Sequence, residues 1–291
     1  MFCHAKALSS QRLLKKSMRI FASLIMILIS SALMAQSYNE LFIEGEKLLK
    51  ANDYSKAAQL FKQVIERDST NKFNEYAYSN LAFAQWQLGE GDSAIESYTK
   101  ALAYNPESAQ IMQQRARLYL EQENVDSALA DYNTVLSIEP RNSHALFMRA
   151  YLYGEKKEYN KAYADYNALL AIEPANNDAR LSLALLYHRA GRLNDALMLL
   201  GLLIDGNPQN AEYYYARSNV EREEKLTALA IMDIEKAIEL APKNAQYHIA
   251  HAQLLLTQGQ KRAARAALDR AVAAGHLRAA LSKMYEECST K

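Results

Sequence analysis

Small and apolar residues recur along this chain with a fixed period of 34 residues. Two series of small residues share the period: Ala82, Ala116, Ala150, Ala184, Ser218 and Ala252, and then Ala94, Ala128, Ala162, Ala196, Ala230 and Ala264. An aromatic or large aliphatic residue follows each member of the second series by four positions, from Tyr98 to Leu268. Residues four apart lie on the same face of a helix. Small residues in both helices of a pair let the two helices approach closely, and the large residue fills the space between neighbouring helices. The pattern predicts a tandem array of helix pairs.

The prolines follow the same period and indicate where the helices end. All five lie 34 residues apart, at Pro106, Pro140, Pro174, Pro208 and Pro242. Proline cannot continue a helix and biases the residue before it out of helical geometry, so each is expected to end a second helix. The nine glycines and five prolines are few for 291 residues, which favours an all-helical protein.

This order of small, alanine, aromatic and proline positions resembles the tetratricopeptide repeat family. The resemblance implies an all-α, right-handed α-solenoid of helix-turn-helix repeats. It places seven repeats at 38–71, 75–108, 109–142, 143–176, 177–210, 211–244 and 245–278. The first repeat has Ser69 in place of proline, and three extra residues, Lys72 to Asn74, precede the second. Residues 279–291 are expected to form a capping helix and tail over the last apolar face.

An uncharged apolar run at residues 20–34 predicts a secretion signal near the N-terminus. Three basic residues within 15–19 precede the run and small residues follow it, which is typical of a signal peptide. The run is shorter than the roughly 20 residues of a membrane-spanning helix. We therefore expect residues 1–35 to be a signal peptide, cleaved after Ala32 or Ala35, and the protein to be exported to the periplasm or secreted.

The stretch before Met18 is unusually long for a basic region, which favours Met18 over Met1 as the start of translation. An uncleaved signal that anchors the chain in a membrane is one alternative, and a cytoplasmic protein with an apolar tail is another. A lipid-anchor form of the signal is not expected, since no cysteine lies at the cleavage region.

Charge argues against nucleic acid and membrane surfaces as partners. Without residues 1–35 the chain has 29 basic and 33 acidic residues, a net charge of −4. A basic face is the usual requirement for binding nucleic acid or an anionic membrane. We therefore expect no nucleic-acid partner, and membrane contact only through an uncleaved signal. The two cysteines, Cys3 and Cys288, leave a single thiol after cleavage, so an intramolecular disulfide is excluded.

No catalytic motif is present along the chain. It has no glycine-rich phosphate loop, no paired-histidine metalloprotease motif and no Gly-x-Ser-x-Gly elbow. His248 and His251 are three residues apart on one predicted helix, a spacing that can ligate zinc, but no third ligand is evident nearby. We therefore expect no metal, no cofactor and no enzyme activity; an enzyme hidden within the array is the least favoured of the function classes.

Arginine and aspartate co-occur within repeats in a way that predicts ion pairs. The third, fourth and sixth repeats have Arg at their seventh position and Asp at their twenty-third, and elsewhere both are absent, as with Leu183 and Leu199. This predicts same-repeat salt bridges between first and second helices: Arg115–Asp131, Arg149–Asp165 and Arg217–Asp233. Such pairs fix the relative position of two helices, so we expect their role to be structural.

The resemblance also implies which surface binds a partner. In such arrays the second, fifth, ninth and twelfth residues of each repeat line the inner surface of the superhelix, on one stripe of the first helices. The candidates are Phe83, Trp86, Gln113, Arg117, Phe147, Tyr151, His188, Tyr215, Asn219 and Arg222. Large aromatics and arginine are enriched at binding hot spots. The alternative interpretation is that some of these side chains only pack against the neighbouring repeat.

These observations predict a non-enzymatic protein-binding scaffold or adaptor of the cell envelope, which holds a segment of another protein in its groove. The alternative function is binding of carbohydrate or cell-wall polymer, since exposed aromatic rings also stack on sugar faces. One subtype of the family clamps a terminal carboxylate of its peptide with Lys and Asn. The corresponding places in the first repeat are Phe42 and Glu46, so that clamp is not predicted.

Overall fold

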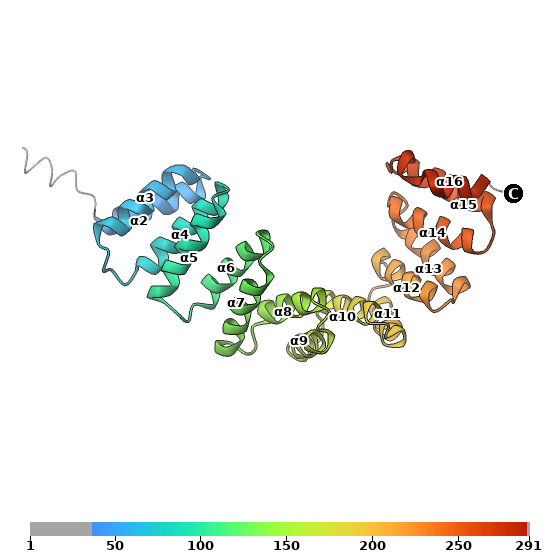
Figure 1. Ribbon diagram of the computed structural model, residues 1–291, viewed down its shortest axis with the longest axis horizontal. Helices are drawn as coiled ribbons and strands as arrows, with labels where there is room; N and C mark the ends of the chain where they lie inside the picture. The colour runs from blue at the N-terminus through green and yellow to red at the C-terminus, as the bar shows by residue number, and fades with distance from the viewer. Residues whose placement is uncertain (1–36, 290–291) are drawn as a thin grey trace, which may run out of the picture. The chain divides into compact units, whose positions relative to one another are not determined.

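The computed structural model describes residues 37–289, so the expected signal peptide and the choice between Met1 and Met18 lie outside the described residues. Residues 37–289 form fifteen α-helices and one short 3-10 helix, and no β-strand occurs among them (Figure 1). The expected fold class, an all-α solenoid of helix-turn-helix repeats, is confirmed. None of the helices in this range combines the length and apolar composition that crossing a bilayer requires.

Each repeat contributes two helices joined by a tight turn. The first three repeats contain α2 (Tyr38–Lys50), α3 (Tyr54–Arg67), α4 (Asn74–Gln87), α5 (Gly91–Tyr104), α6 (Ala109–Glu121) and α7 (Val125–Ile138). The remaining repeats contain α8 (Ser143–Glu155), α9 (Tyr159–Ile172), α10 (Asn177–Arg189), α11 (Leu193–Gly206), α12 (Ala211–Glu223), α13 (Thr227–Leu240), α14 (Ala245–Thr257) and α15 (Lys261–Ala273). The chain ends with η1 (Arg278–Leu281) and α16 (Ser282–Ser289).

The chain forms two compact units, with the boundary between Asp131 and Tyr132 inside α7. The first unit contains α2 to α6 and the beginning of α7, and the second contains the rest. In the first unit each helix from α2 to α6 packs on the next, and the same holds from α8 to α16 in the second. Each unit therefore builds its core from neighbours in sequence, as a repeat array does.

The periodic small and large residues form the core of each repeat. The recurring alanine of the second helix is fully buried in every repeat, from Ala57 to Ala264, and the large residue four positions later is almost fully buried. The approach is close in the first repeat, where a Cβ atom added to Gly45 would lie 2.8 Å from Cζ of Phe61. Glycine at this position therefore leaves room for the Phe61 ring.

Side chains cap the first helices with the same period, a regularity that the sequence predictions did not use. The caps of the third to seventh repeats are Ser108, Asn142, Asn176, Asn210 and Asn244. Each side-chain oxygen accepts a hydrogen bond from a backbone N–H two or three residues later. Such a cap stabilises a helix by about 1 kcal/mol.

The last repeat is covered by the C-terminal segment. Leu281 and Tyr285 are buried in one cluster with residues of α14 and α15. The Tyr285 hydroxyl donates a hydrogen bond to Asp269 Oδ1 at 2.8 Å, and the Arg278 guanidinium lies 4.2 Å from the centre of the Tyr285 ring. These contacts place η1 and α16 over the apolar face that the last helix pair would otherwise expose.

Candidate functional site

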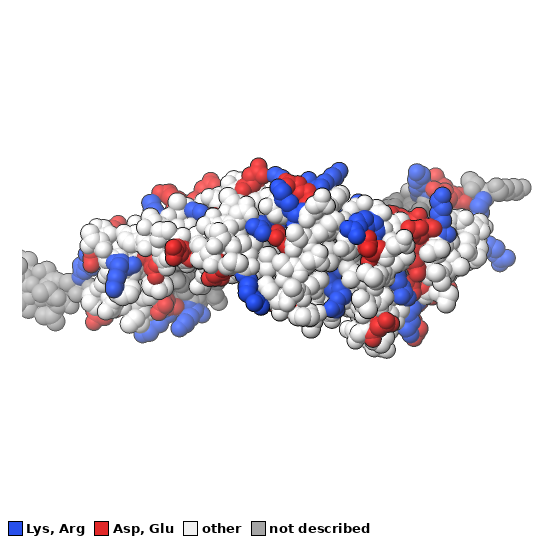
Figure 2. Space-filling view, turned by 90° about the horizontal axis from the view of Figure 1, so that it is seen from below, with Lys and Arg blue, Asp and Glu red and all other residues white. Residues whose placement is uncertain are grey.

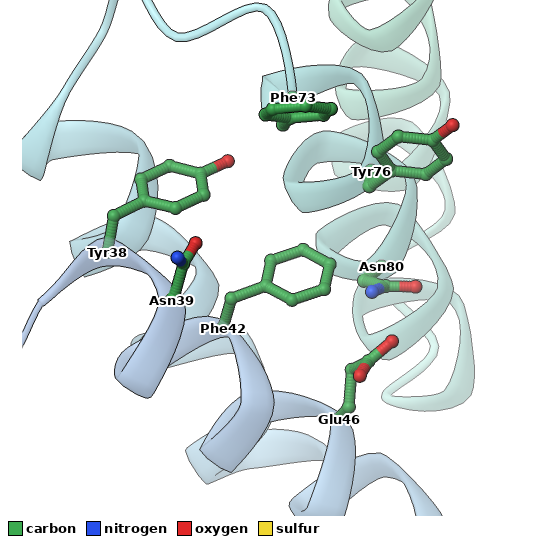
Figure 3. A pocket seen from close by; sticks show the side chains of 7 residues that line it. All are labelled: Tyr38, Asn39, Phe42, Glu46, Phe73, Tyr76 and Asn80. Atoms are coloured by element: carbon green, nitrogen blue, oxygen red, sulfur yellow. The ribbon is translucent and has the colours of Figure 1, made fainter.

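An aromatic pocket lies between the first helices of the first unit (Figure 3). Its volume is about 380 Å³, and its walls come from α2, α4 and the segment just before α4. The lining residues are Tyr38, Asn39, Phe42, Glu46, Phe73, Tyr76 and Asn80. A concave, mostly apolar pocket with a few polar groups is the usual form of a ligand site. This pocket is therefore the first candidate for the functional site.

The pocket includes part of the three-residue insertion that breaks the 34-residue period. Asn74 is the residue that the period would place at the helix cap, but α4 is instead preceded by Phe73, whose side chain forms no cap. Asn74 is fully buried; its Oδ1 accepts a hydrogen bond from the Tyr38 hydroxyl at 3.1 Å, and its Nδ2 donates to the Asp68 carbonyl at 2.8 Å. The amide thus ties the inserted segment to α2.

Four of the seven residues that line the pocket are aromatic. The rings of Tyr38 and Phe42 are nearly parallel, 8° apart, with centres 6.4 Å from each other. Phe42 also meets the core ring of Phe61 edge to face at 5.6 Å, which fixes its position. On the other side, Phe73 and Tyr76 remain 53% and 54% exposed. Two rings are therefore held by the core, and two are open to a ligand.

The groove candidates of the first unit form a connected cluster. Phe83 meets Trp86 edge to face at 5.9 Å, and the Arg117 guanidinium lies 4.4 Å from the Trp86 ring centre. Trp86 Nε1 donates a hydrogen bond to Glu121 Oε2 at 2.7 Å. Gln113 is half-buried on the same helix as Arg117. Trp86 is therefore held by side chains of the next repeat and contributes to the contact between repeats.

Polar groove candidates of the second unit also bridge consecutive repeats. His188 Nε2 lies 3.1 Å from Glu223 Oε2, and Arg222 Nη1 donates a hydrogen bond to Gln253 Oε1 at 3.1 Å. Asn219 is half-buried on the same helix as Arg222. Like Trp86, His188 and Arg222 occupy the twelfth place of their repeats. This place faces the following repeat, so its side chains support the array as much as they line a groove.

The aromatic groove candidates of the second unit differ in exposure. Phe147 meets Tyr166 edge to face at 5.7 Å, and the centres of the Tyr215 and Tyr247 rings are 5.0 Å apart. Tyr151, in contrast, is 47% exposed. Of the aromatic candidates in this unit, Tyr151 therefore offers the most free surface.

Leu185 is a surface residue that the predicted groove set omitted. It is 39% exposed on α10 and occupies the ninth place of its repeat, as Tyr151 does on α8. Leu185 has neither the aromatic ring nor the polar group that the predicted groove residues share. Its place in the repeat was the signal that could have identified it.

The structure contains each of the three expected Arg–Asp pairs, within one repeat and with two hydrogen bonds. Arg115, Arg149 and Arg217 donate through Nε and Nη2 to both carboxylate oxygens of Asp131, Asp165 and Asp233, at 2.6–3.0 Å. All three aspartates are buried. Hydrogen bonding to the partner carboxylate raises the pKa of each arginine.

Two of these arginines also reach back to the preceding repeat. Arg115 Nη1 donates to Thr99 Oγ1, and Arg149 Nη1 donates to Asn133 Oδ1, both at 2.9 Å. The equivalent place before Arg217 is Gly201, which has no side chain. The first two pairs therefore fix the spacing of repeats as well as the spacing of the two helices within a repeat.

The third pair has an additional carboxylate beside it. Glu221 is buried, its Oε1 lies 3.9 Å from Arg217 Nε, and its Oε2 has no hydrogen-bond partner among the described residues. Burial raises the pKa of Glu221 to about 7, and repulsion from Asp233 adds to the increase. Arg217 opposes this effect without cancelling it. The folded protein therefore holds a proton on Glu221 at pH values where the unfolded chain does not.

This proton predicts a pH-dependent stability. Because the folded pKa exceeds the unfolded value, stability is highest below the unfolded pKa and falls as the pH rises towards 7. Between pH 5 and pH 8 the melting temperature should therefore fall less in Glu221→Gln than in the parent protein. Thermal unfolding followed by circular dichroism at the two values measures the difference, with the exposed Glu224→Gln as control. An identical decrease in all three proteins would contradict the assignment.

The described residues form no metal site, and the face drawn in Figure 2 shows no patch of a single charge. Figure 2 shows basic and acidic side chains interspersed over that face. Within residues 37–289 no group of three or more metal-ligating side chains is close enough to hold a metal ion. His248 and His251 are buried; His248 Nε2 lies 2.8 Å from the Pro242 carbonyl, and His251 Nε2 lies 3.6 Å from Glu235 Oε1.

Comparison with known families and structures agrees with this architecture. Three family models described as tetratricopeptide repeat match residues 44–110, 86–150, 155–220 and 211–244. A tetratricopeptide repeat protein from Parabacteroides merdae ATCC 43184 is 26% identical, with 88% of this chain and 100% of that chain covered and a TM-score of 0.65.

Two more distant structures share the fold. The C-terminal part of a TPR repeat-containing protein from Cytophaga hutchinsonii is 17% identical, with 80% of this chain and 95% of that chain covered and a TM-score of 0.67. YrrB, described as a TPR protein with an unusual peptide-binding site, is 19% identical, with 64% and 94% covered and a TM-score of 0.53.

Proposed function

We propose that this chain, which belongs to the tetratricopeptide repeat family, is a non-enzymatic scaffold that holds a segment of another protein against its first helices. The observation that carries the proposal is the exposed apolar surface of these helices. In the first unit it is the aromatic pocket, and in the second it includes Tyr151 and Leu185. Exposed aromatic and aliphatic side chains beside polar groups are typical of protein-binding surfaces.

In the proposed scaffold, some side chains hold the repeats together and others contact the partner. Trp86 and Arg222 donate hydrogen bonds to the next repeat, and His188 lies 3.1 Å from a carboxylate of the next repeat, so these side chains keep successive first helices in register. The exposed side chains between them are free to contact a partner. A peptide-binding site in a protein of the same fold, YrrB, supports the proposal by analogy of fold.

We place this scaffold in the cell envelope, exported to the periplasm or secreted. The support is the order of basic, apolar and small residues before residue 36. A membrane contact through an uncleaved form of that segment is the alternative. No nucleic-acid partner and no cofactor enters the proposal.

Two exposed leucines of the fifth repeat provide a matched test. Leu185 lies on the first helix, 39% exposed, and Leu202 lies on the second, 55% exposed. We expect Tyr151→Ala with Leu185→Ala to weaken binding of peptides selected on the purified protein by about tenfold or more, as loss of interface hot spots does. Met198→Ala with Leu202→Ala, which removes exposed apolar surface from α11, should change the affinity by less than about twofold.

Calorimetry with both double variants shows whether peptides bind to the first helices or to α11. Equal losses, or a loss only in the α11 variant, would show that the first helices are not the binding surface. Selection of no peptide, together with retention of the protein on purified wall polymer, would instead favour carbohydrate binding through the exposed rings.

A further inference from the structure

We propose that the aromatic pocket of the first unit takes a cationic side chain, arginine or lysine, of the bound segment. This inference rests on the proposed scaffold function and names the chemistry that one of its sites recognises. The pocket is lined by four aromatic rings, two amides and one carboxylate, and by no basic residue.

The arrangement of the rings suits a cation. Figure 3 shows the rings of Tyr38, Phe42, Phe73 and Tyr76 around one open space, with Asn80 and Glu46 at its lower edge. The face of an aromatic ring carries partial negative charge and attracts an ammonium or guanidinium group within about 6 Å of its centre. A cation in this space would therefore lie near more than one ring.

Acidic side chains predominate on the two helices that line the pocket, and the basic residues of α2, Lys47 and Lys50, lie in its last turn. Residues 38–46 of α2 and all of α4 contain four acidic residues and no basic residue. Glu46 is the one charged residue among those that line the pocket, and it forms no ion pair among the described residues. A cation entering the pocket would gain this carboxylate as a partner, whereas a carboxylate ligand would be repelled by it.

An ammonium group of the chain itself already uses one of the rings. Lys72 Nζ lies 5.1 Å from the centre of the Phe73 ring. This contact shows that the ring is accessible to a cation. It also places a like charge close to the pocket, so Lys72 should oppose the binding of a second cation.

An apolar side chain fits the pocket less well than a cation with an aliphatic stem. Filling the space with hydrocarbon alone would remove water from Glu46 and the two amides without replacing their hydrogen bonds, which is unfavourable. Arginine and lysine have stems that pack on the rings and head groups that reach the polar edge. The volume of about 380 Å³ has room for such a side chain.

The test uses short capped peptides that differ only in charge. N-acetyl-Gly-Arg-Gly-amide should bind the purified full chain and shift the NMR signals of labelled Tyr76 and Phe73. The same peptide with citrulline, a neutral analogue of arginine, should bind about tenfold more weakly, since it keeps the shape and loses the charge. Raising the salt concentration should weaken binding of the arginine peptide and leave binding of the citrulline peptide unchanged.

Two substitutions of opposite charge provide the decisive control. Glu46→Gln should lower the affinity for the arginine peptide about threefold to fivefold, and Lys72→Gln should raise it about twofold. Changes of this size are usual for partly exposed charges. Glu66→Gln and Lys62→Gln, on the exposed surface of α3, should leave the affinity unchanged. Circular dichroism of each variant checks that the fold is retained.

The results separate this inference from the scaffold function. Equal binding of the arginine and citrulline peptides, no binding of either, or no effect of Glu46→Gln and Lys72→Gln would overturn the cationic pocket. Binding of a wall oligosaccharide at the same residues without dependence on charge would overturn it too. Selected peptides that still require Tyr151 and Leu185 would show that the scaffold function stands when the pocket inference fails.

Discussion

Replacing Phe61 with alanine is expected to lower the free energy of unfolding of the first unit by about 3–5 kcal/mol. The ring is fully buried between α2 and α3, next to Gly45 and edge to face with Phe42. Its removal leaves a cavity between the two helices. Urea unfolding monitored by the fluorescence of Trp86, the only tryptophan of the chain, reports on this unit. Phe73→Ala, at an exposed ring, should cost less than about 1 kcal/mol.

The contact between Gly45 and Phe61 adds an internal check. Gly45→Ala alone should destabilise, because the new methyl group would lie 2.8 Å from Cζ of Phe61. Combined with Phe61→Leu it should recover part of the loss, since the fifth and seventh repeats pair Ala184 with Leu200 and Ala252 with Leu268. Simple additivity of the two changes would show that the side chains do not compete for the same space.

The second large effect is expected at the ion pair of the fourth repeat. Asp165→Ala should lower the free energy of unfolding by about 2–4 kcal/mol, because it leaves the largely buried guanidinium of Arg149 without its two carboxylate acceptors. Urea unfolding followed by circular dichroism measures the loss. Glu96→Ala, which breaks the exposed pair with Lys100, should cost less than about 0.5 kcal/mol.

The fifth repeat suggests how the loss at Asp165 can be restored. It has Leu183 and Leu199 where the fourth has Arg149 and Asp165. Replacing both members of the fourth-repeat pair with leucine should therefore be much less harmful than Asp165→Ala, since no charge is left buried without a partner. A double variant as unstable as the single one would contradict the view that the uncompensated arginine causes the damage.

The fold could be predicted because its contacts repeat with the sequence. Gly45 and Ala57 recur as small residues in later repeats because the helices of every pair must approach each other. The Arg–Asp pairs could be predicted for a similar reason: the two residues appear and disappear together, which a direct contact within one repeat explains. The series of caps from Ser108 to Asn244 follows the same period and could have been found in the same way.

The pocket could not be predicted because it arises where the period fails. The period shows that Lys72 to Asn74 are extra residues, but nothing in their types shows that Asn74 is buried or that Phe73 remains exposed. The groove stripe has a related difficulty. Trp86 and Tyr151 both belong to it, yet the first is bound by the next repeat and the second is open. The exposure of a side chain depends on its contacts with the neighbouring repeat. Its place on its own helix does not determine those contacts.

The most direct test of the scaffold function is crosslinking in the native cell from both kinds of helix. A photoreactive residue is placed at Tyr76 or Tyr151 on the first helices, or at Met198, which is 59% exposed on a second helix. Mass spectrometry of the adducts also reports the processed N-terminus. The scaffold function predicts adducts with the same partner protein from Tyr76 and Tyr151 and not from Met198. Equal adducts from all three positions, or adducts with wall polymer alone, would contradict it.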